Sequence, residues 1–210
     1  MKIPTRFLPI AVMILVPAVV RLLPYILGAF GMGDVHDVTA FLWNFSPVSA
    51  LFLFGGAKLA DRRASYLVPL AAMLLSDLGI GLLMGDLNMG IHAMIPVVYG
   101  SYAAMVWLGT LLRNNRNPLA IAAAGFAGEA VFFVVTNFAN WVVQSDTYPH
   151  TFAGLSACYV AALPFFRHSL TSLALYGTAL FAGFAFLERK YAAAKPAPAL
   201  SSESNQPAAV

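Results

Sequence analysis

Long apolar runs separated by short polar segments dominate this chain. Five runs have the length of about 20 residues that a helix needs to cross a bilayer, at residues 7–27, 64–84, 92–112, 118–143 and 169–187. A sixth run, at residues 41–59, contains Asn44, Pro47 and the pair Gly55 and Gly56, so it predicts a short or broken span. The pattern therefore predicts six membrane spans.

The segment at residues 152–166 is apolar but too short for a span. Its fifteen residues would reach only about 22 Å as a helix, against a hydrocarbon core of roughly 30 Å. We therefore predict an all-α integral membrane protein, a six-transmembrane-helix bundle with a short re-entrant or interfacial helix before the last span. This bundle is a single domain at residues 1–191, and the Pro- and Ser-rich residues 192–210 are expected to form a disordered cytoplasmic tail.

Composition supports the membrane class. The chain has 210 residues, of which 60% are hydrophobic and only 10% are charged, and its mean hydropathy is +0.77. These values exclude a soluble globular domain and a disordered chain. The single cysteine, Cys158, excludes an internal disulfide framework and a multi-cysteine metal site.

The basic residues alternate between loops in the way that sets membrane topology. The formal net charge is +3, but the Lys and Arg residues are scattered between apolar runs, so no nucleic-acid partner is expected. Ten of the twelve lie on one predicted side: Lys2, Arg6, Lys58, Arg62, Arg63, Arg113, Arg116, Arg189, Lys190 and Lys195. The positive-inside rule then predicts that both termini of this multi-pass membrane protein are cytoplasmic.

Three ionisable residues lie inside predicted spans, where a charge is costly: Arg21, Asp77 and Glu129. Arg21 and Asp77 are expected at the same outer depth, so we predict an ion pair, either purely structural or in contact with a ligand. Glu129 stands alone in the middle of its span. The alternatives for it are a neutral structural carboxyl, a partner of a serine or tyrosine, a coupling site and a contact for a polar cargo.

Amide and aromatic side chains gather at the predicted outer ends of the helices. Amides offer donors and acceptors together, and aromatic rings offer a stacking face, so this group suits a small polar solute with a planar or cationic part. An interfacial belt is the alternative for the aromatic members. The candidate substrate-binding residues are Asn44, Asp77, Asn137, Asn140, Trp141 and Tyr148.

Enzyme signatures are missing from the sequence. The histidines have no metal-ligand spacing, and neither a Gly-x-Ser-x-Gly nor a Walker motif occurs, so we expect no catalytic residue, metal or cofactor. Two alternatives to transport stay open. One is a membrane-embedded enzyme that uses Asp77, Glu129 or His150 as an acid or base, and the other is a structural membrane protein without a ligand.

Several blocks of sequence resemble DUF6580, a bacterial family of uncharacterised six-span proteins. They are Asn44-Phe-Ser-Pro-Val-Ser-Ala50, Phe54-Gly-Gly56, the run from Leu67 to Asp77, Thr136-Asn-Phe138, Tyr148-Pro-His-Thr, Gly154-Leu-Ser-Ala-Cys-Tyr159 and Leu163-Pro-Phe-Phe166. The resemblance implies a membrane transport protein of the bacterial inner membrane, without indicating its cargo.

A weaker resemblance, in size and architecture, is to the S components of energy-coupling-factor (ECF) transporters. It implies a subunit that captures a vitamin-like solute in an outward-facing pocket, with coupling and ATPase subunits as partners. The Ala-x-x-x-Ala motif on which many S components dock is not matched here, because Leu15 follows four residues after Ala11. The lipid bilayer and a small-molecule solute are the other expected partners.

Overall fold

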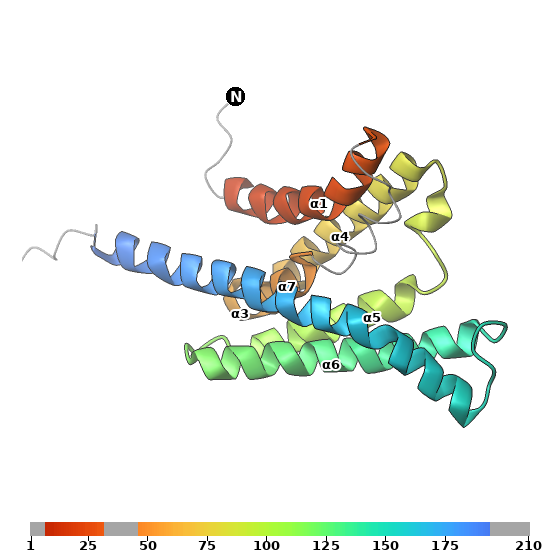
Figure 1. Cartoon of the computed structure of the whole chain (residues 1–210). Coiled ribbons are helices and arrows are strands. Elements are labelled where there is room, and N and C mark those ends of the chain that lie inside the picture. The colour runs from red at the N-terminus through yellow and green to blue at the C-terminus, as the bar shows by residue number, and fades with distance from the viewer. Residues whose placement is uncertain (1–6, 32–45, 194–210) are drawn as a thin grey trace, which may run out of the picture.

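The structure is a computed structural model that describes residues 7–31 and 46–193, and all the regular secondary structure in these ranges is helical (Figure 1). The helices are α1 (Phe7–Ala29), α3 (Val48–Lys58), α4 (Arg62–Met84), α5 (Ile95–Thr110), α6 (Pro118–Val143) and α7 (Phe152–Ala193), with a short 3₁₀ helix η1 (Leu87–Met89) between α4 and α5. The prediction of an all-α fold is therefore confirmed for the described part of the chain.

Four of these helices, α1, α4, α6 and α7, are long and apolar enough to cross a bilayer. The other two are shorter. Helix α5 has 16 residues and α3 has 11, which correspond to lengths of about 24 Å and 16 Å. The helices thus have the length and composition of membrane helices, whereas the predicted count of six spans is not confirmed.

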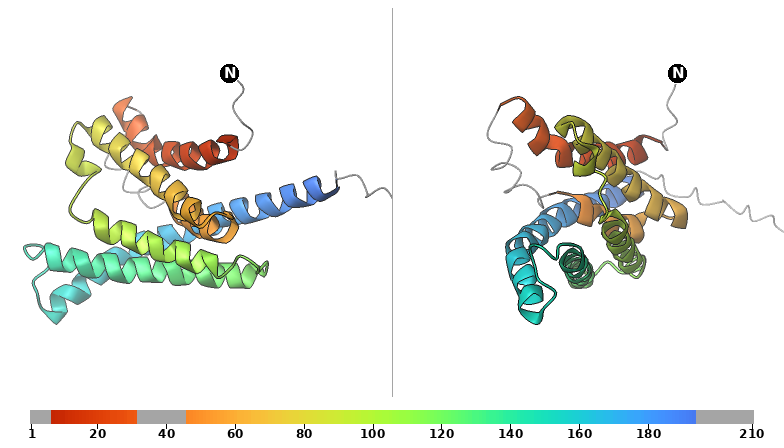
Figure 2. Two further views of the ribbon diagram at one scale, coloured as in Figure 1. Left: turned by 180° about the vertical axis from the view of Figure 1, so that it is seen from behind. Right: turned by 90° about the vertical axis from the view of Figure 1, so that its right-hand side faces the viewer.

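Helix α3 forms the centre of the molecule. Helix α1 lies against α4 on one side, α5, α6 and α7 form the other side, and α3 lies between them (Figures 1 and 2). Every residue of α3 from Val48 to Ala57 is buried. A helix that is apolar on all faces has to be enclosed by its neighbours, which explains this central position.

The crossing of α3 and α5 depends on two glycines. A Cβ atom added to Gly56 would lie 2.1 Å from the carbonyl oxygen of Val106, and one added to Gly109 would lie 2.3 Å from the carbonyl oxygen of Leu53. Both positions therefore exclude any side chain. Small residues at a crossing let two helix backbones approach closely, which is a common way to hold helices together in membranes.

Residues 152–193 form one helix rather than the predicted short helix followed by a separate span. Pro164 lies inside α7 without ending it, and the helix continues through Arg167 and His168. Proline is tolerated in membrane helices because neighbouring groups can satisfy the freed carbonyl. With 42 residues α7 is about 63 Å long, roughly twice the hydrocarbon thickness, and the re-entrant helix is not confirmed.

Other boundaries agree closely with the prediction. Helix α6 has the predicted bounds, and α1 and α4 differ from their predicted bounds by only two residues at one end each. The run predicted at 41–59 contains α3, but residues 41–45 lie outside the described part. So does the predicted tail at 192–210, apart from its first two residues, which belong to α7.

Candidate functional site

A polar cavity with a volume of about 350 Å³ lies between the start of α3 and parts of α1, α4, α5, α6 and α7. The lining combines charged, hydroxyl and amide side chains with a few rings. Its main polar members are Arg21, Ser46, Ser49, Asp77, Asn137 and Asn140.

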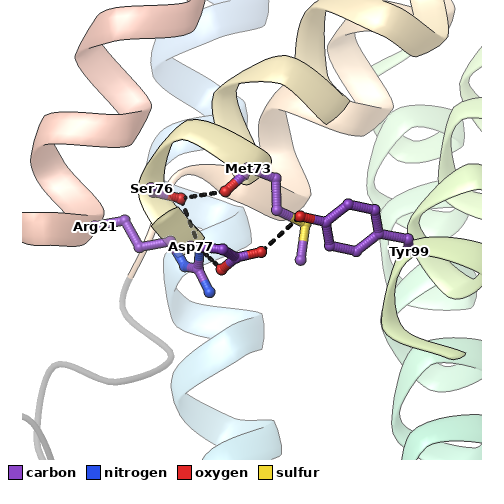
Figure 3. A network of polar contacts seen from close by, with 5 residues as sticks. All are labelled: Arg21, Met73, Ser76, Asp77 and Tyr99. Carbon is purple, nitrogen blue, oxygen red and sulfur yellow. Dashed lines mark hydrogen bonds and ion pairs between the residues drawn. The ribbon is translucent and has the colours of Figure 1, made fainter. Parts of the chain in front are cut away.

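Asp77 belongs to a compact polar network on the wall of this cavity. Figure 3 shows Arg21 reaching from α1 toward the Asp77 carboxylate on α4, with Tyr99 of α5 approaching the same group from the other side. Arg21 forms an ion pair with Oδ1 of Asp77, and the Tyr99 hydroxyl donates to Oδ2 at 2.6 Å. Arg21 also donates to Oγ of Ser76 at 2.6 Å, and Ser76 donates to the carbonyl oxygen of Met73 at 2.7 Å. Both carboxylate oxygens of Asp77 are therefore occupied by protein donors.

The segment after α4 brings further side chains to the cavity by packing on the α4 backbone. A Cβ atom added to Gly90 would lie 1.8 Å from the carbonyl oxygen of Asp77, so only glycine fits at this contact. The close approach places Met89, His92 and Met94 on the cavity wall. His92 is also exposed, so it lies where the cavity meets the surface.

One face of α6 supplies the amides. Phe132, Thr136 and Asn140 follow one another at helical spacing, and all three line the cavity together with Asn137. The Asn137 amide donates to the carbonyl oxygen of Phe133 at 2.8 Å. Asn140 contacts the sulfur of Cys158 on α7, with 3.7 Å between Nδ2 and Sγ. Asn137 and Asn140 thus line the same cavity as Asp77 instead of facing the lipid.

The N-terminal end of α3 opens into the cavity. No side chain caps this helix, and its first i→i−4 bond runs from the N–H of Leu51 to the carbonyl oxygen of Pro47 at 2.9 Å. Ser49, in the first turn of α3, and Ser46, which precedes the helix, both line the cavity. Free N–H groups and the helix dipole make such an end partly positive, which favours acceptor groups of a ligand.

The opposite end of α3 is closed by an arginine. Nε of Arg113 donates to the carbonyl oxygen of Gly56 at 3.2 Å, and its Nη2 donates to that of Leu59 at 3.4 Å. A cation at a helix C-terminus satisfies the last carbonyl groups and complements the dipole. Helix α3 therefore has a closed C-terminal end and an open, cavity-facing N-terminal end.

The two aromatic candidates lie apart from the cavity. Nε1 of Trp141 donates to the carbonyl oxygen of Pro149 at 3.0 Å, and its ring contacts that of His150 at a centroid distance of 5.1 Å. Tyr148 belongs to the same connection between α6 and α7, where its N–H donates to the carbonyl oxygen of Gln144. Neither Trp141 nor Tyr148 lines the cavity, and Asn44 lies outside the described residues.

Glu129 precedes Phe132 by about one turn of α6 and is buried, with only 1% of its surface exposed. Its carboxyl group is hydrogen-bonded to the hydroxyl of Ser49, which is also hydrogen-bonded to Tyr102. The second carboxyl oxygen, Oε1, has no hydrogen-bond partner in the part of the chain that the structure describes. Ser49 and Tyr102 were not among the predicted site residues, although a tyrosine within an apolar span is itself a signal of a polar site.

No group of three metal-ligating side chains gathers within residues 7–31 and 46–193. The fold and the cavity together are those of a helical protein with membrane-type spans around a small polar chamber. The chain belongs to the family described as "Family of unknown function (DUF6580)", which it matches over residues 1–199. Neither the curated proteins nor the solved structures contain a match to this chain.

Proposed function

We propose that this protein is a membrane transport protein, and specifically a subunit that binds a small polar solute. The observation that carries the proposal is the polar cavity, in which Asn137, Asn140 and the open end of α3 meet between apolar helices. Its volume of about 350 Å³ falls at the lower end of the range of roughly 300 to 1,000 Å³ that is usual for ligand sites. A chamber of this size fits a vitamin-like solute and is too small for a lipid.

The distribution of charge along α3 supports an outward-facing cavity. Lys58 ends this helix, and Arg113 binds its last carbonyl groups, so basic residues gather at the end of α3 that lies away from the cavity. By the positive-inside rule the basic end faces the cytoplasm, and the cavity then faces the outside. In this orientation the protein is a subunit of the bacterial inner membrane with both termini in the cytoplasm.

Uptake against a gradient would need an energy source outside this chain, because the sequence has no Walker motif. We propose coupling and ATPase subunits as partners, by analogy with the S components that the sequence resembles. In a complex of this kind, the present chain would capture the solute, and the partner subunits would drive its release.

Mass spectrometry of small molecules retained after purification in mild detergent tests the proposed function. We expect a solute that copurifies with the wild-type protein and is lost from the Asn137→Ala/Asn140→Ala variant. The matched control is Asn114→Ala, which removes an exposed amide outside the cavity and should leave retention unchanged. The melting temperature of each variant is measured alongside, and loss of retention counts only where that temperature is nearly unchanged.

The proposal fails if the wild-type protein retains no solute, or if the Asn137→Ala/Asn140→Ala variant retains it as well as Asn114→Ala does. In that case the amides would serve the packing of α6 against α7, as the contact between Asn140 and Cys158 already does.

A further inference from the structure

Glu129 is a buried carboxyl group without a cationic partner among the residues that the structure describes. Only 1% of its surface is exposed, and Oε1 has no hydrogen-bond partner among the described residues. Native structures satisfy almost all buried polar atoms, so an unpartnered carboxyl oxygen requires an explanation. A missing ligand group is one such explanation.

Two arginines of the neighbouring segments already have partners. Arg21 is paired with Asp77, and Arg113 binds the carbonyl groups at the far end of α3. Within the described part of the chain, no Lys or Arg forms an ion pair with Glu129. An ionised carboxylate in this apolar interior would therefore need a positive charge from outside the described residues, and a bound solute can supply it.

Glu129 lies behind the wall of the cavity and is not itself one of the lining residues. Its hydrogen-bond partner Ser49 lines the cavity, and so do Tyr102 and Phe132. Phe132 is three residues after Glu129, so both lie on the same side of α6. The Ser49 hydroxyl therefore links the buried carboxyl group to the cavity.

We propose that the solute carries a primary ammonium group, which pairs with Oε1 of Glu129 at the part of the cavity wall that Ser49, Tyr102 and Phe132 form. This inference rests on the proposed function and specifies the solute class. It also assigns the charge-bearing role to Glu129 in place of Asp77, whose two oxygens are occupied by Arg21 and Tyr99. The amides of α6 then hold the neutral polar part of the same molecule.

Thermal-shift binding measurements with matched pairs of probes test this inference on the full chain in detergent. One pair is tyramine and its alcohol tyrosol, and the other is 1,4-diaminobutane and 1,4-butanediol. Within each pair, the alcohol carries hydroxyl groups where the amine carries ammonium groups. We expect at least one amine to raise the melting temperature and its alcohol to bind at least about 30-fold more weakly. This factor is what the loss of one partner of a buried charge pair costs in affinity. The same loss is expected for the amine in Glu129→Gln.

Glu188→Gln is the matched control, because Glu188 pairs with Arg116 at 3.2 Å outside the cavity. It should leave amine binding unchanged. If Glu129→Gln does not fold, Glu129→Asp keeps the charge but moves it back by one methylene group, and it should bind the amine more weakly than the wild type does.

Equal binding of amine and alcohol, or undiminished amine binding in Glu129→Gln, overturns the inference, and so does the absence of a shift with every amine. A retained solute without a basic nitrogen also overturns it, but leaves the proposed function standing. Failure of the proposed function is recognised separately, by the absence of any retained solute or by full retention in the asparagine variant.

Discussion

Arg21 and Asp77 carry opposite charges between the apolar helices α1 and α4. The contacts around them explain how the fold tolerates two charged side chains in an apolar interior. Asp77 is 3% exposed and receives donors from Arg21 and Tyr99, while Arg21 also binds Ser76. A buried ion pair is tolerated only when further hydrogen bonds satisfy the remaining atoms. The network thereby fixes α1 against α4 at one wall of the cavity.

A double-mutant cycle on thermal unfolding in detergent measures this coupling. Removing one partner leaves the other charge buried and unpaired, so Asp77→Asn and Arg21→Gln should each cost on the order of 3 kcal/mol. The double variant should cost clearly less than the sum of the two. The exposed pair of Arg116 and Glu188 is the control, with an expected coupling of at most about 1 kcal/mol. Strict additivity at Arg21 and Asp77 would show that the two charges act independently.

At the scale of elements, α3 determines how the cavity is built. Its apolar body is enclosed by the longer helices, its C-terminal end is closed by Arg113, and its N-terminal end is open to the cavity. Helices that end inside a protein in this way are known binding elements in transporters, because their exposed ends present unpaired backbone groups. The position of α3 depends on its glycine crossing with α5.

Two glycines of α5 provide a matched test of that crossing. At Gly109 an added methyl group would meet the carbonyl oxygen of Leu53 in α3, whereas at Gly100 it would meet nothing within 4 Å. Gly109→Ala should therefore destabilise the protein by about 1 to 3 kcal/mol through overpacking. Gly100→Ala should be neutral or slightly stabilising, since alanine is the better helix former. Similar melting temperatures for the two variants would contradict the close packing of α3 on α5.

The helices could be predicted from the sequence because apolar length is a strong signal. The bounds of α6, for example, follow from Pro118 at its start and the polar segment after Val143. The continuity of α7 could not be predicted in this way. Pro164 and the polar pair Arg167 and His168 are typical helix-ending signals, yet local sequence does not show whether neighbouring helices satisfy the backbone there.

The site could be predicted only in part. Asp77, Asn137 and Asn140 stand out because polar side chains are costly within apolar spans, and they do line one cavity. The hydrogen bonds that link Glu129 to Ser49 and Ser49 to Tyr102 join three helices, so no spacing along the chain indicates them. Trp141 belongs to the predicted group because it lies at the same outer helix end as the amides. Residues at one depth still point in different directions around a helix, so depth alone does not show which side chains share a cavity.

At the scale of the whole molecule, α3 separates a basic end from a polar cavity. Lys58 and Arg113 lie at one end of this helix, whereas the cavity with Asp77, Asn137 and Asn140 lies at the other. This arrangement is the basis of the proposed orientation, in which the cavity opens to the outside of the cell.

Cysteine labelling of intact cells with a membrane-impermeant reagent tests that orientation most directly. His92→Cys probes the exposed edge of the cavity and Asn114→Cys the segment next to Arg113, while the native Cys158 is 2% exposed and should contribute little background. The account predicts that Cys at position 92 is labelled in intact cells and that Cys at position 114 is labelled only after permeabilisation. Labelling of position 114 from outside, with position 92 protected, would contradict it.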